Sequence, residues 1–127
     1  MSHTIVVVAA VIEVDGQFLV TRRQKGVHLE GLWEFPGGKV DGNETHAEAL
    51  SREIREELGA SAIPGELVLH TSHDYPDRAV ELHFYRCRIE GTPSPQLGQR
   101  MEWVPRADLA ALGFPPADEE LIRGLTG

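Results

Sequence analysis

The hydrophobic pattern at the start of the chain predicts a β-hairpin. Residues 4–14 (TIVVVAAVIEV) are almost continuously apolar and rich in β-branched side chains, as in a strand that is buried on both faces. Asp15 and Gly16 form a dipeptide that favours a two-residue hairpin turn, and residues 17–23 predict the returning strand. Residues 24–36 then predict a loop.

The rest of the chain alternates between strand and helix patterns. Further strands are predicted at residues 65–75, 79–90 and 100–104, and helices at residues 46–58, 105–113 and 115–125. Strands mixed with one long helix and a helical C-terminus predict an α/β fold in which a sheet packs between helices. A length of 127 residues suits a single domain spanning residues 1–127.

Local residues define the boundaries of the long helix. Thr45 and Glu48 have the spacing of a capping box, and Gly59 suits the position after the last helical turn, so the helix should span residues 46–58. With about 3.6 residues per turn, one face of this helix should turn four apolar side chains towards the core, namely Ala47, Leu50, Ile54 and Leu58.

A stripe of carboxylates borders this apolar face. Glu53, Glu56 and Glu57 are helical neighbours, and neighbouring carboxylates repel one another. One interpretation is a solvated face in which Arg52 pairs with Glu48 and Glu56. The alternative is a site for a divalent cation, because Mg²⁺ and Mn²⁺ bind carboxylate oxygens and offset their repulsion. The position beside the apolar stripe, where the edge of a cleft would lie, favours the cation.

Charge and composition exclude several classes of protein. The formal net charge is −8, and residues 34–59 contribute half of it with seven acidic and three basic residues, which argues against binding a nucleic-acid polymer. No apolar run approaches the roughly 20 residues of a membrane helix, and the first residues lack the pattern of a signal peptide. The single cysteine, Cys87, fits a reducing compartment, so the cytoplasm is the expected location. No heptad pattern predicts an obligate dimer, and a monomer is expected.

Residues 38–60 resemble the Nudix box, G-x5-E-x7-R-E-U-x-E-E-x-G-U, in which U is a bulky aliphatic residue. Gly38, Glu44 and the run from Arg52 to Gly59 match all seven fixed identities at the required spacing, and only Ala60, at the last position, is smaller than usual. The segments TRR, WEFPGGK, YPDR and FPPADE resemble the MutT-type branch of the Nudix hydrolase family in order and spacing. The resemblance therefore covers nearly the whole chain.

This resemblance implies a Nudix fold, in which a mixed β-sheet lies between helices in an α/β/α sandwich. It also implies a hydrolase that cleaves a nucleoside triphosphate to the monophosphate and pyrophosphate with Mg²⁺, for which Mn²⁺ is a substitute. The substrate would be 8-oxo-dGTP, as in members that sanitise the nucleotide pool, or a pyrimidine nucleotide (CTP, dCTP or 5-methyl-dCTP), as in the CTP pyrophosphohydrolase type. A carboxylate-rich site suits this chemistry, because phosphoryl transfer depends mainly on positioning and on neutralising charge.

By the same resemblance, the box supplies the metal ligands and the catalytic groups. The implied metal ligands are the Gly37 carbonyl, Glu53, Glu56 and Glu57. The general base would be Glu53 or Glu56, and Arg52 would orient a box glutamate through a salt bridge. Glu44 and Gly59 would support the structure of the box.

Residues outside the box would bind the substrate. The resemblance implies Arg23 and His28 near the phosphates, Gly38 where the backbone approaches them, Phe35 at a base pocket, Arg78 near the nucleotide and Asp118 at the base. Taken singly, His28 is equally compatible with an ordinary loop residue, and Phe35 with the core. His70, His73 and His83 alternate with apolar residues on predicted strands and are not expected to be ligands.

Asp118 bears on the choice of base. An asparagine at this position would accept from N7–H of 8-oxoguanine and donate to O6, whereas an ionised aspartate only accepts, which suits the exocyclic amine of cytosine. A buried aspartate that keeps its proton is again a donor. A further alternative is that the side chain caps the last helix. The sequence leaves these alternatives open.

One position departs from the family pattern. Many MutT-type members have a glutamate, which serves as a further metal ligand or base, immediately before a Gly-Gln pair; here Leu97 precedes Gly98 and Gln99. Glu102 lies nearby in the sequence, but its position beside Trp103 on a predicted strand favours a structural role. The departure keeps open a third interpretation, a Nudix-fold nucleotide-binding module without catalysis, although the intact box glutamates favour the enzyme.

Overall fold

A computed structural model of the protein describes residues 4–26 and 30–127. The strands in this part of the chain are β1 (Thr4–Val11), β2 (Glu13–Val14), β3 (Gln17–Arg22), β4 (Trp33–Glu34), β5 (Gly37–Lys39), β6 (Ser61–Tyr75), β7 (Arg78–Glu90) and β8 (Met101–Pro105). The helices are α1 (His46–Leu58), α2 (Glu119–Thr126) and the 3₁₀ helices η1 (Arg106–Ala111) and η2 (Pro116–Asp118).

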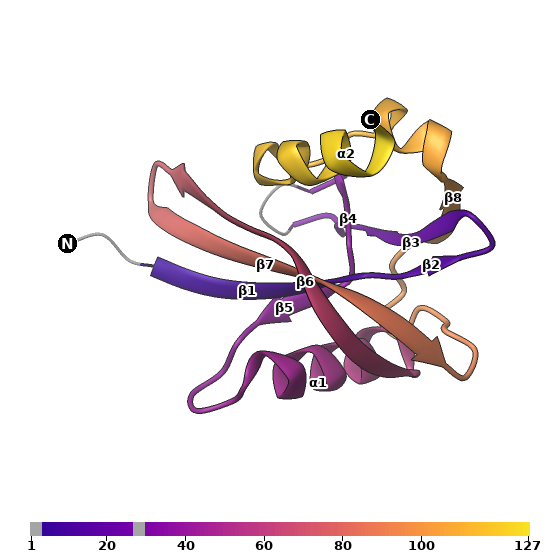
Figure 1. The fold of residues 1–127 in the computed structure, drawn as a ribbon. Coiled ribbons are helices and arrows are strands. Elements are labelled where there is room, and N and C mark those ends of the chain that lie inside the picture. Colours follow the sequence, from indigo (N-terminus) through magenta and orange to yellow (C-terminus); the bar gives the residue numbers. More distant parts are fainter. Residues whose placement is uncertain (1–3, 27–29) are drawn as a thin grey trace.

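The strands form two sheets that lie between helices. The first sheet has the order β5-β1-β7-β6, in which β1 runs parallel to β7 and antiparallel to β5, and β6 runs antiparallel to β7. The second has the order β2-β3-β4, and β8 also pairs with β3. Helix α1 covers one side of the first sheet and α2 lies on the other (Figure 1). The predicted α/β fold, a mixed sheet packed between helices, is confirmed.

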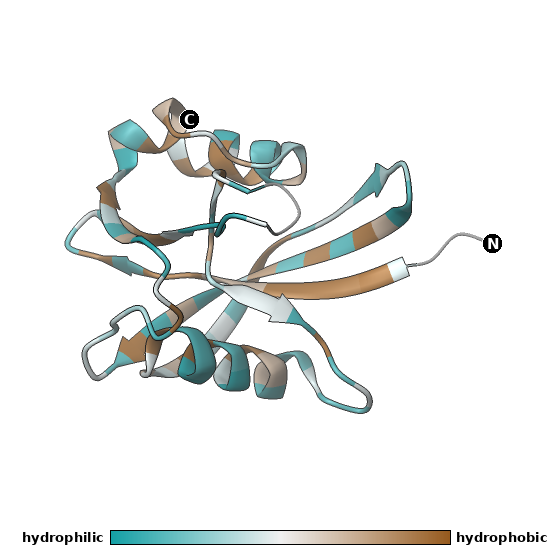
Figure 2. Cartoon of the chain, turned by 180° about the vertical axis from the view of Figure 1, so that it is seen from behind, coloured by the Kyte–Doolittle hydropathy of each residue, from teal (hydrophilic) through white to brown (hydrophobic). Residues whose placement is uncertain are grey.

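Strand β1 has two buried faces, as its continuous apolar sequence predicts. Val8 and Ala10 pack with the apolar face of α1, whereas Ala9 and Val11 belong to the core that includes α2. Successive side chains of a strand point to opposite faces, so a strand covered on both sides needs an unbroken apolar run. The run is visible along β1 in Figure 2.

The hairpin turn is confirmed, but the strand before it is interrupted. Asp15 and Gly16 have φ angles of 52° and 77°, the left-handed conformations that a type I′ turn requires. The strand expected over residues 4–14 breaks at Ile12, where the chain leaves the first sheet and enters the second.

Helix α1 begins and ends as predicted. Both hydrogen bonds of the capping box between Thr45 and Glu48 are present, and Gly59 closes the helix with a φ of 64°. One detail of its apolar stripe was wrong: Ala47 is exposed, and Ala49 takes the buried position beside Leu50.

Several other boundaries differ from the prediction. Strand β6 begins at Ser61, four residues early, and β4 lies within the expected loop of residues 24–36. The helix predicted at residues 105–113 is the 3₁₀ helix η1, and the last helix is divided into η2 and α2. None of the helices in residues 4–26 and 30–127 is both long enough and apolar enough to cross a membrane.

Candidate active site

The short strand β5 brings two glycines of the box against helix α1. Gly37 donates its N–H to Oε2 of Glu57, with an N–O distance of 3.1 Å. A Cβ atom on Gly37 would overlap the carbonyl oxygen of Val8 on β1, and one on Gly38 would overlap the carboxyl group of Glu53. Glycine is therefore required at both positions for the box strand to lie this close to the carboxylates.

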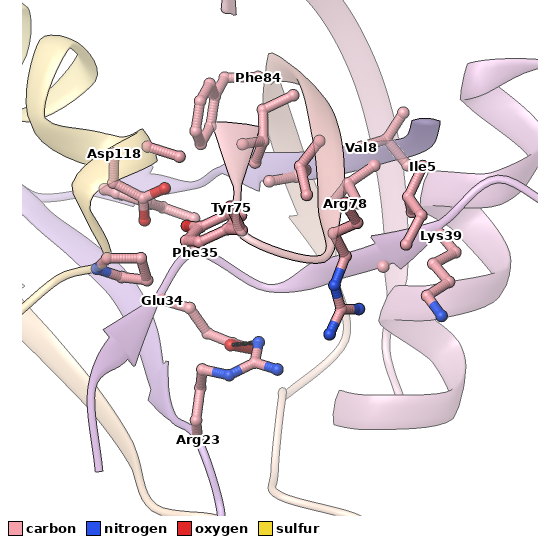
Figure 3. A pocket seen from close by; sticks show the side chains of 17 residues that line it. Ile5, Val8, Arg23, Glu34, Phe35, Lys39, Tyr75, Arg78, Phe84 and Asp118 are labelled. Carbon is pink, nitrogen blue, oxygen red and sulfur yellow. Dashed lines mark hydrogen bonds and ion pairs between the residues drawn. The ribbon is translucent and has the colours of Figure 1, made fainter. Parts of the chain in front are cut away.

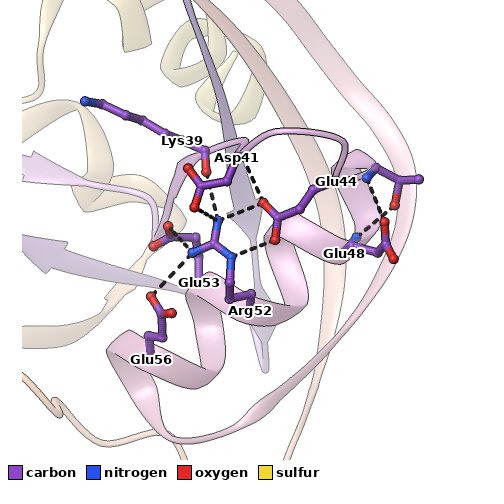
Figure 4. A network of polar contacts seen from close by, with 8 residues as sticks. Lys39, Asp41, Glu44, Glu48, Arg52, Glu53 and Glu56 are labelled. Carbon is purple, nitrogen blue, oxygen red and sulfur yellow. Dashed lines mark hydrogen bonds and ion pairs between the residues drawn. The ribbon is translucent and has the colours of Figure 1, made fainter.

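Arg52 connects the carboxylates of the box (Figure 4). Its Nε and Nη2 donate to the two carboxylate oxygens of Glu44 at 2.7 and 2.9 Å, a bidentate pair. Its Nη1 donates to Glu53 at 2.9 Å and to Glu56 at 3.4 Å, and Nη2 also donates to the Lys39 carbonyl at 3.0 Å. The arginine thus ties the helix to the loop before it and fixes the orientation of Glu53.

Glu44 holds the other side of this network. Its carboxylate accepts from Arg52 and from the backbone N–H of Asp41, and these hydrogen bonds lower the pKa of Glu44 to about 2. Glu48, which was considered as a partner of Arg52, is instead engaged in the capping box. Of the two pairs in the solvated-face interpretation, Arg52 therefore forms the one with Glu56 and not the one with Glu48, and it also binds Glu44 and Glu53.

Two carboxylates of the box, Glu53 and Glu57, lie where ionisation is unfavourable. Burial raises the pKa of Glu57 to about 8, and the negative charges of Glu34 and Glu53 add to the shift. Burial also raises the pKa of Glu53, which Arg52 opposes. Glu56 is more open, with 58% of its side chain exposed. Clustered carboxylate oxygens whose mutual repulsion a bound positive charge would relieve fit the donor set of a hard divalent cation.

A cavity of about 270 Å³, here called the base pocket, runs from the start of α2 to the box strand (Figure 3). Its walls are mainly apolar and include Phe35, Tyr75 and Phe84, and Asp118 and Gly38 both line it. One end of the base pocket is therefore next to the carboxylates of the box, because Gly38, which lines the pocket, lies against Glu53.

Asp118 is a buried acid of the base pocket. Only 5% of the residue is exposed, and its side chain makes no capping hydrogen bond to α2, so the capping alternative is wrong. Burial raises the pKa of Asp118 to about 7, with a further rise from the charge of Glu34 and an opposing effect of Arg23. Near neutral pH a large fraction of this carboxyl group is therefore protonated.

Two arginines line the same pocket. Arg23 forms an ion pair with Glu34, with 2.6 Å between Nη1 and Oε2. Arg78 pairs with Asp77 at 3.4 Å, and its Nε is buried without a hydrogen-bond partner among the described residues. A buried donor that lacks a partner is costly, so this nitrogen is suited to a ligand oxygen in the pocket.

A smaller cavity of about 160 Å³ lies next to Glu57 and contains the position where the family pattern departs. Leu97 and Gln99 line it together with Glu34 and Glu57. Gln99 donates from Nε2 to the carbonyl of Glu57 and accepts from the N–H of Leu97, which holds this loop against the end of α1. Leu97 therefore lines the same small cavity as the box residue Glu57. Glu102 on β8 is exposed and pairs with Arg100, which precedes the strand.

The structure brings most of the predicted site residues together. Arg23, Phe35, Gly38, Arg78 and Asp118 all line the base pocket. The box residues Gly37, Glu44, Arg52, Glu53, Glu56, Glu57 and Gly59 surround or support the carboxylate site. His28 lies outside the described residues.

Sequence reasoning missed two residues that the geometry makes prominent. Glu34 lines both cavities and raises the pKa values of Asp118 and Glu57. Tyr75 lines the base pocket, and the charge of Asp118 contributes to the rise in its pKa, after burial. The available signals were weak: both residues belong to segments that carry the family resemblance, WEFPGGK and YPDR, but no spacing rule points to them.

The comparison with known proteins identifies the family. A sequence model described as the NUDIX domain matches residues 7–124, and the chain belongs to this family. Together with the fold and the box carboxylates, this makes the protein a Nudix hydrolase, as the resemblance implied.

Individual relatives agree with the MutT-type resemblance. The chain is 37% identical to an 8-oxo-dGTP diphosphatase of Escherichia coli strain K12 over an alignment of 112 residues that covers 87% of each protein. It is 38% identical over 117 residues to a CTP pyrophosphohydrolase of the same strain, which covers 91% of this chain and 87% of the relative. The solved structure of a MutT protein of the Nudix hydrolase family from methicillin-resistant Staphylococcus aureus 252 is similar, with a TM-score of 0.81 and 37% identity, over 99% of this chain and 98% of that one.

Proposed function

We propose that residues 1–127 act as a single Nudix hydrolase domain that cleaves a nucleoside triphosphate to the monophosphate and pyrophosphate, with 8-oxo-dGTP as the principal substrate. The observation that carries this proposal is the continuity of the base pocket, which reaches from a buried hydrogen-bonding acid, Asp118, to the box glycine Gly38. A nucleotide has the same arrangement, with a flat hydrogen-bonding base at one end and phosphates at the other.

The walls of the cavity suit such an orientation. The aromatic rings of Phe35 and Phe84 contact each other edge to face and offer apolar surface at the base end. Arg23 and Arg78 line the cavity and supply positive charge for the triphosphate. A phosphate oxygen would also accept a hydrogen bond from Nε of Arg78, which has no partner among the described residues.

The protonation of Asp118 supports the oxidised purine as the preferred base. A neutral carboxylic acid has one carbonyl acceptor and one O–H donor. In this it resembles a carboxamide, which has a carbonyl acceptor and an NH₂ donor group. Such a group accepts from N7–H of 8-oxoguanine and donates to O6 at the same time. Because burial raises the pKa of Asp118 to about 7, this neutral form is accessible at neutral pH. The E. coli relative named 8-oxo-dGTP diphosphatase agrees with this choice.

The proposed metal is Mg²⁺, with Mn²⁺ as a substitute. Glu53, Glu56, Glu57 and the carbonyl of Gly37 would hold it, since they offer the oxygen ligands that hard cations prefer. When bound, the cation neutralises phosphate charge and lowers the pKa of a water. Glu53 or Glu56 would act as general base, and Arg52 holds Glu53 in place through the hydrogen bond of 2.9 Å.

A second candidate substrate is a cytosine nucleotide, CTP, dCTP or 5-methyl-dCTP. A pKa of about 7 also leaves an ionised fraction of Asp118, and a carboxylate accepts from the exocyclic amine of cytosine. The 38% identity to the CTP pyrophosphohydrolase of E. coli supports this candidate. The two candidates differ in the protonation state of one side chain.

A comparison of substrates separates these candidates. Pyrophosphate release with Mg²⁺ gives kcat/KM for 8-oxo-dGTP, dGTP, CTP, dCTP and 5-methyl-dCTP under one condition. We expect 8-oxo-dGTP to exceed dGTP by roughly 100-fold or more, because a site built around a hydrogen-bonded pair rejects a base that lacks it. A lead for the cytosine nucleotides would overturn the purine assignment. Inactivity with every substrate in both Mg²⁺ and Mn²⁺ would instead support the third interpretation, a binding module in which Leu97 replaces an essential glutamate.

We further propose that the enzyme works in the cytoplasm as a monomer. The one cysteine, Cys87, is a buried free thiol, and burial raises its pKa to about 11, which suits an unreactive side chain in a reducing compartment. The large apolar side chains that are exposed among the described residues, Val14, Leu67 and Leu97, belong to three separate segments. Light scattering coupled to size exclusion would measure the mass, and a stable dimer would contradict the proposal.

A further inference from the structure

A group of histidines lies on the α1 side of the first sheet, away from the base pocket. His70 on β6 is directly paired with His83 on β7. Leu82 and Phe84, the neighbours of His83 in the strand, line the base pocket. Because side chains alternate along a strand, His83 points to the opposite face of the sheet, and so does Glu81, two residues before it.

The side chains of His70, Glu81 and His83, here called the histidine cluster, lie close together. Oε1 of Glu81 is 3.2 Å from Nε2 of His70 and 3.9 Å from Nε2 of His83. A potential ligand atom from each of the three residues lies within 4.8 Å of the others. In a tetrahedral zinc site with bonds of about 2.0–2.2 Å, the ligand atoms are about 3.3–3.6 Å apart. Separations of up to 4.8 Å therefore have to shorten before the three atoms enclose a cation.

The three side chains of the histidine cluster differ in exposure, so that His83 is held by its neighbours while His70 and Glu81 are free to adjust. The ring of His83 is 15% exposed and packs at 4.4 Å against the ring of His46, whose Nδ1 is 2.7 Å from the hydroxyl of Tyr85. His70 and Glu81 are more open, with 47% and 39% of their side chains exposed. The rings of His70 and His83 are stacked at 4.1 Å and nearly parallel, so binding would require the open ring of His70 to turn towards the other two ligand atoms. Solvent exposure on this side also provides a path of entry.

The ligand set differs from that of the Nudix box. Two imidazole nitrogens and one carboxylate favour a first-row transition ion over Mg²⁺, which prefers oxygen ligands. Three protein ligands leave a fourth position for water, as in open zinc sites. Partial burial and the two neighbouring histidines lower the pKa of His83, which favours the neutral, metal-binding form of the ring.

We propose that His70, Glu81 and His83 form a second metal site, specific for a divalent transition-metal cation of the Zn²⁺ type and separate from the Mg²⁺ site of the box. The sequence did not predict it, because the histidine on β6 reaches the other two residues only through the register of the strand pair. The site is independent of the proposed substrate.

Zinc retention tests this proposal without any assay of activity. The full chain is equilibrated with Zn²⁺ in millimolar Mg²⁺, desalted, and analysed for zinc per chain by mass spectrometry, and a competition titration with a chromophoric chelator gives the affinity. We expect one equivalent of Zn²⁺ in the wild type and in Glu53→Gln, because the box is not the site. His70→Gln and Glu81→Gln alter exposed side chains, so their folding should survive, and each should weaken Zn²⁺ binding roughly tenfold or more.

The matched control is His73→Gln. His73 lies on the same strand but contacts Tyr75 rather than the cluster, so its replacement should leave the Zn²⁺ affinity unchanged. Substitution by Co²⁺ adds a spectroscopic readout, since a tetrahedral site with nitrogen ligands gives visible absorption bands that should disappear in His70→Gln. Three results would overturn the proposal: no retained zinc in the wild type, equal affinity in wild type and His70→Gln, or loss of zinc in Glu53→Gln but not in Glu81→Gln.

Discussion

Arg23 and Glu34 form an ion pair in which Nη1 and Oε2 are 2.6 Å apart, and both side chains line both the base pocket and the smaller cavity next to Glu57. Although paired, Glu34 is partly buried, and burial raises its own pKa. Its charge also raises the pKa values of Asp118 at one end of the site and of Glu57 at the other. Glu34 is therefore coupled electrostatically both to Asp118, the proposed base-recognition residue, and to Glu57, a proposed metal ligand.

Replacement of Glu34 by glutamine should change the pH at which the enzyme distinguishes bases. Without the negative charge, the pKa of Asp118 should fall, so the neutral form that suits 8-oxo-dGTP is lost at a lower pH. The ratio of kcat/KM for 8-oxo-dGTP to that for CTP, measured from pH 5.5 to about 8.5, should begin to decline at a lower pH in the variant than in the wild type. Glu66→Gln, which removes an exposed charge, is the control. Superimposable pH profiles for Glu34→Gln and the wild type would show that Glu34 does not influence Asp118.

Replacement of Asp118 by asparagine should stabilise the protein in a pH-dependent manner. The pKa of Asp118 rises from 3.8 to about 7 on folding, so between these values the folded state binds a proton that the unfolded state has released. The free energy of unfolding of the wild type therefore falls as the pH rises through this range. Since each pKa unit corresponds to about 1.4 kcal/mol, Asp118→Asn should match the wild type at or below about pH 3.8 and exceed it by a few kcal/mol at pH 8.

Urea denaturation of both proteins at several pH values measures the difference between their free energies of unfolding. The contributions of the other titrating groups largely cancel in this difference. A difference that stays constant between pH 4 and pH 8 would mean that Asp118 is ionised throughout. The same variant should retain activity on 8-oxo-dGTP, because the amide offers a donor and an acceptor at any pH.

Replacement of Glu53 by glutamine should abolish turnover while nucleotide binding survives. The amide preserves the shape of the side chain but removes the charge that a metal ligand or base requires. Mutation of a residue that hydrogen-bonds to a metal ligand typically costs roughly 10–100-fold in activity, and we expect kcat to fall by more than this in Glu53→Gln. Glu48→Gln is the matched control on the same helix, because glutamine also serves in a capping box. Near-normal turnover in Glu53→Gln would refute the assignment of the metal site.

Replacement of Gly38 by alanine should damage the site more than the fold. The new Cβ atom would overlap the carboxyl group of Glu53 and displace it from Arg52. Turnover should fall strongly, while thermal unfolding shows a loss of about 1–3 kcal/mol. In contrast, Gly124→Ala places a methyl group in open space on helix α2 and should raise the free energy of unfolding by about 0.5–1 kcal/mol. Full activity in Gly38→Ala would show that the carboxyl group has room to move.

Local signals predicted the parts of the fold that short segments determine. The capping box at Thr45 and Glu48, the C-terminal Gly59 and the turn at Asp15 and Gly16 all depend on neighbours in the sequence, and each was confirmed. Helix spacing also indicated the stripe of Glu53, Glu56 and Glu57, whereas the other residues of the box were identified by the family resemblance.

The remainder depended on contacts between distant segments. Strand β5 is only three residues long and forms because it pairs with β1, so no local sequence pattern predicts it. The burial of Asp118 results from the packing of η2 near the end of β6, and its pKa follows from that burial. The role of Leu97 likewise required the loop to be placed beside Glu57.

The position of the box glutamates within α1 has a thermodynamic consequence. Glu53, Glu56 and Glu57 lie in the C-terminal half of the helix, where the helix macrodipole is negative and disfavours anions. The backbone N–H groups of Ser94 and Gln96 satisfy the carbonyls of Leu58 and Glu57, but they bring no net charge to this pole. A divalent cation bound here would be attracted by the carboxylates and the macrodipole together, and would act as an electrostatic C-terminal cap of α1. Metal occupancy and folding stability would then be linked, so that substitutions which relieve the repulsion among these glutamates in the metal-free protein should also weaken cation binding.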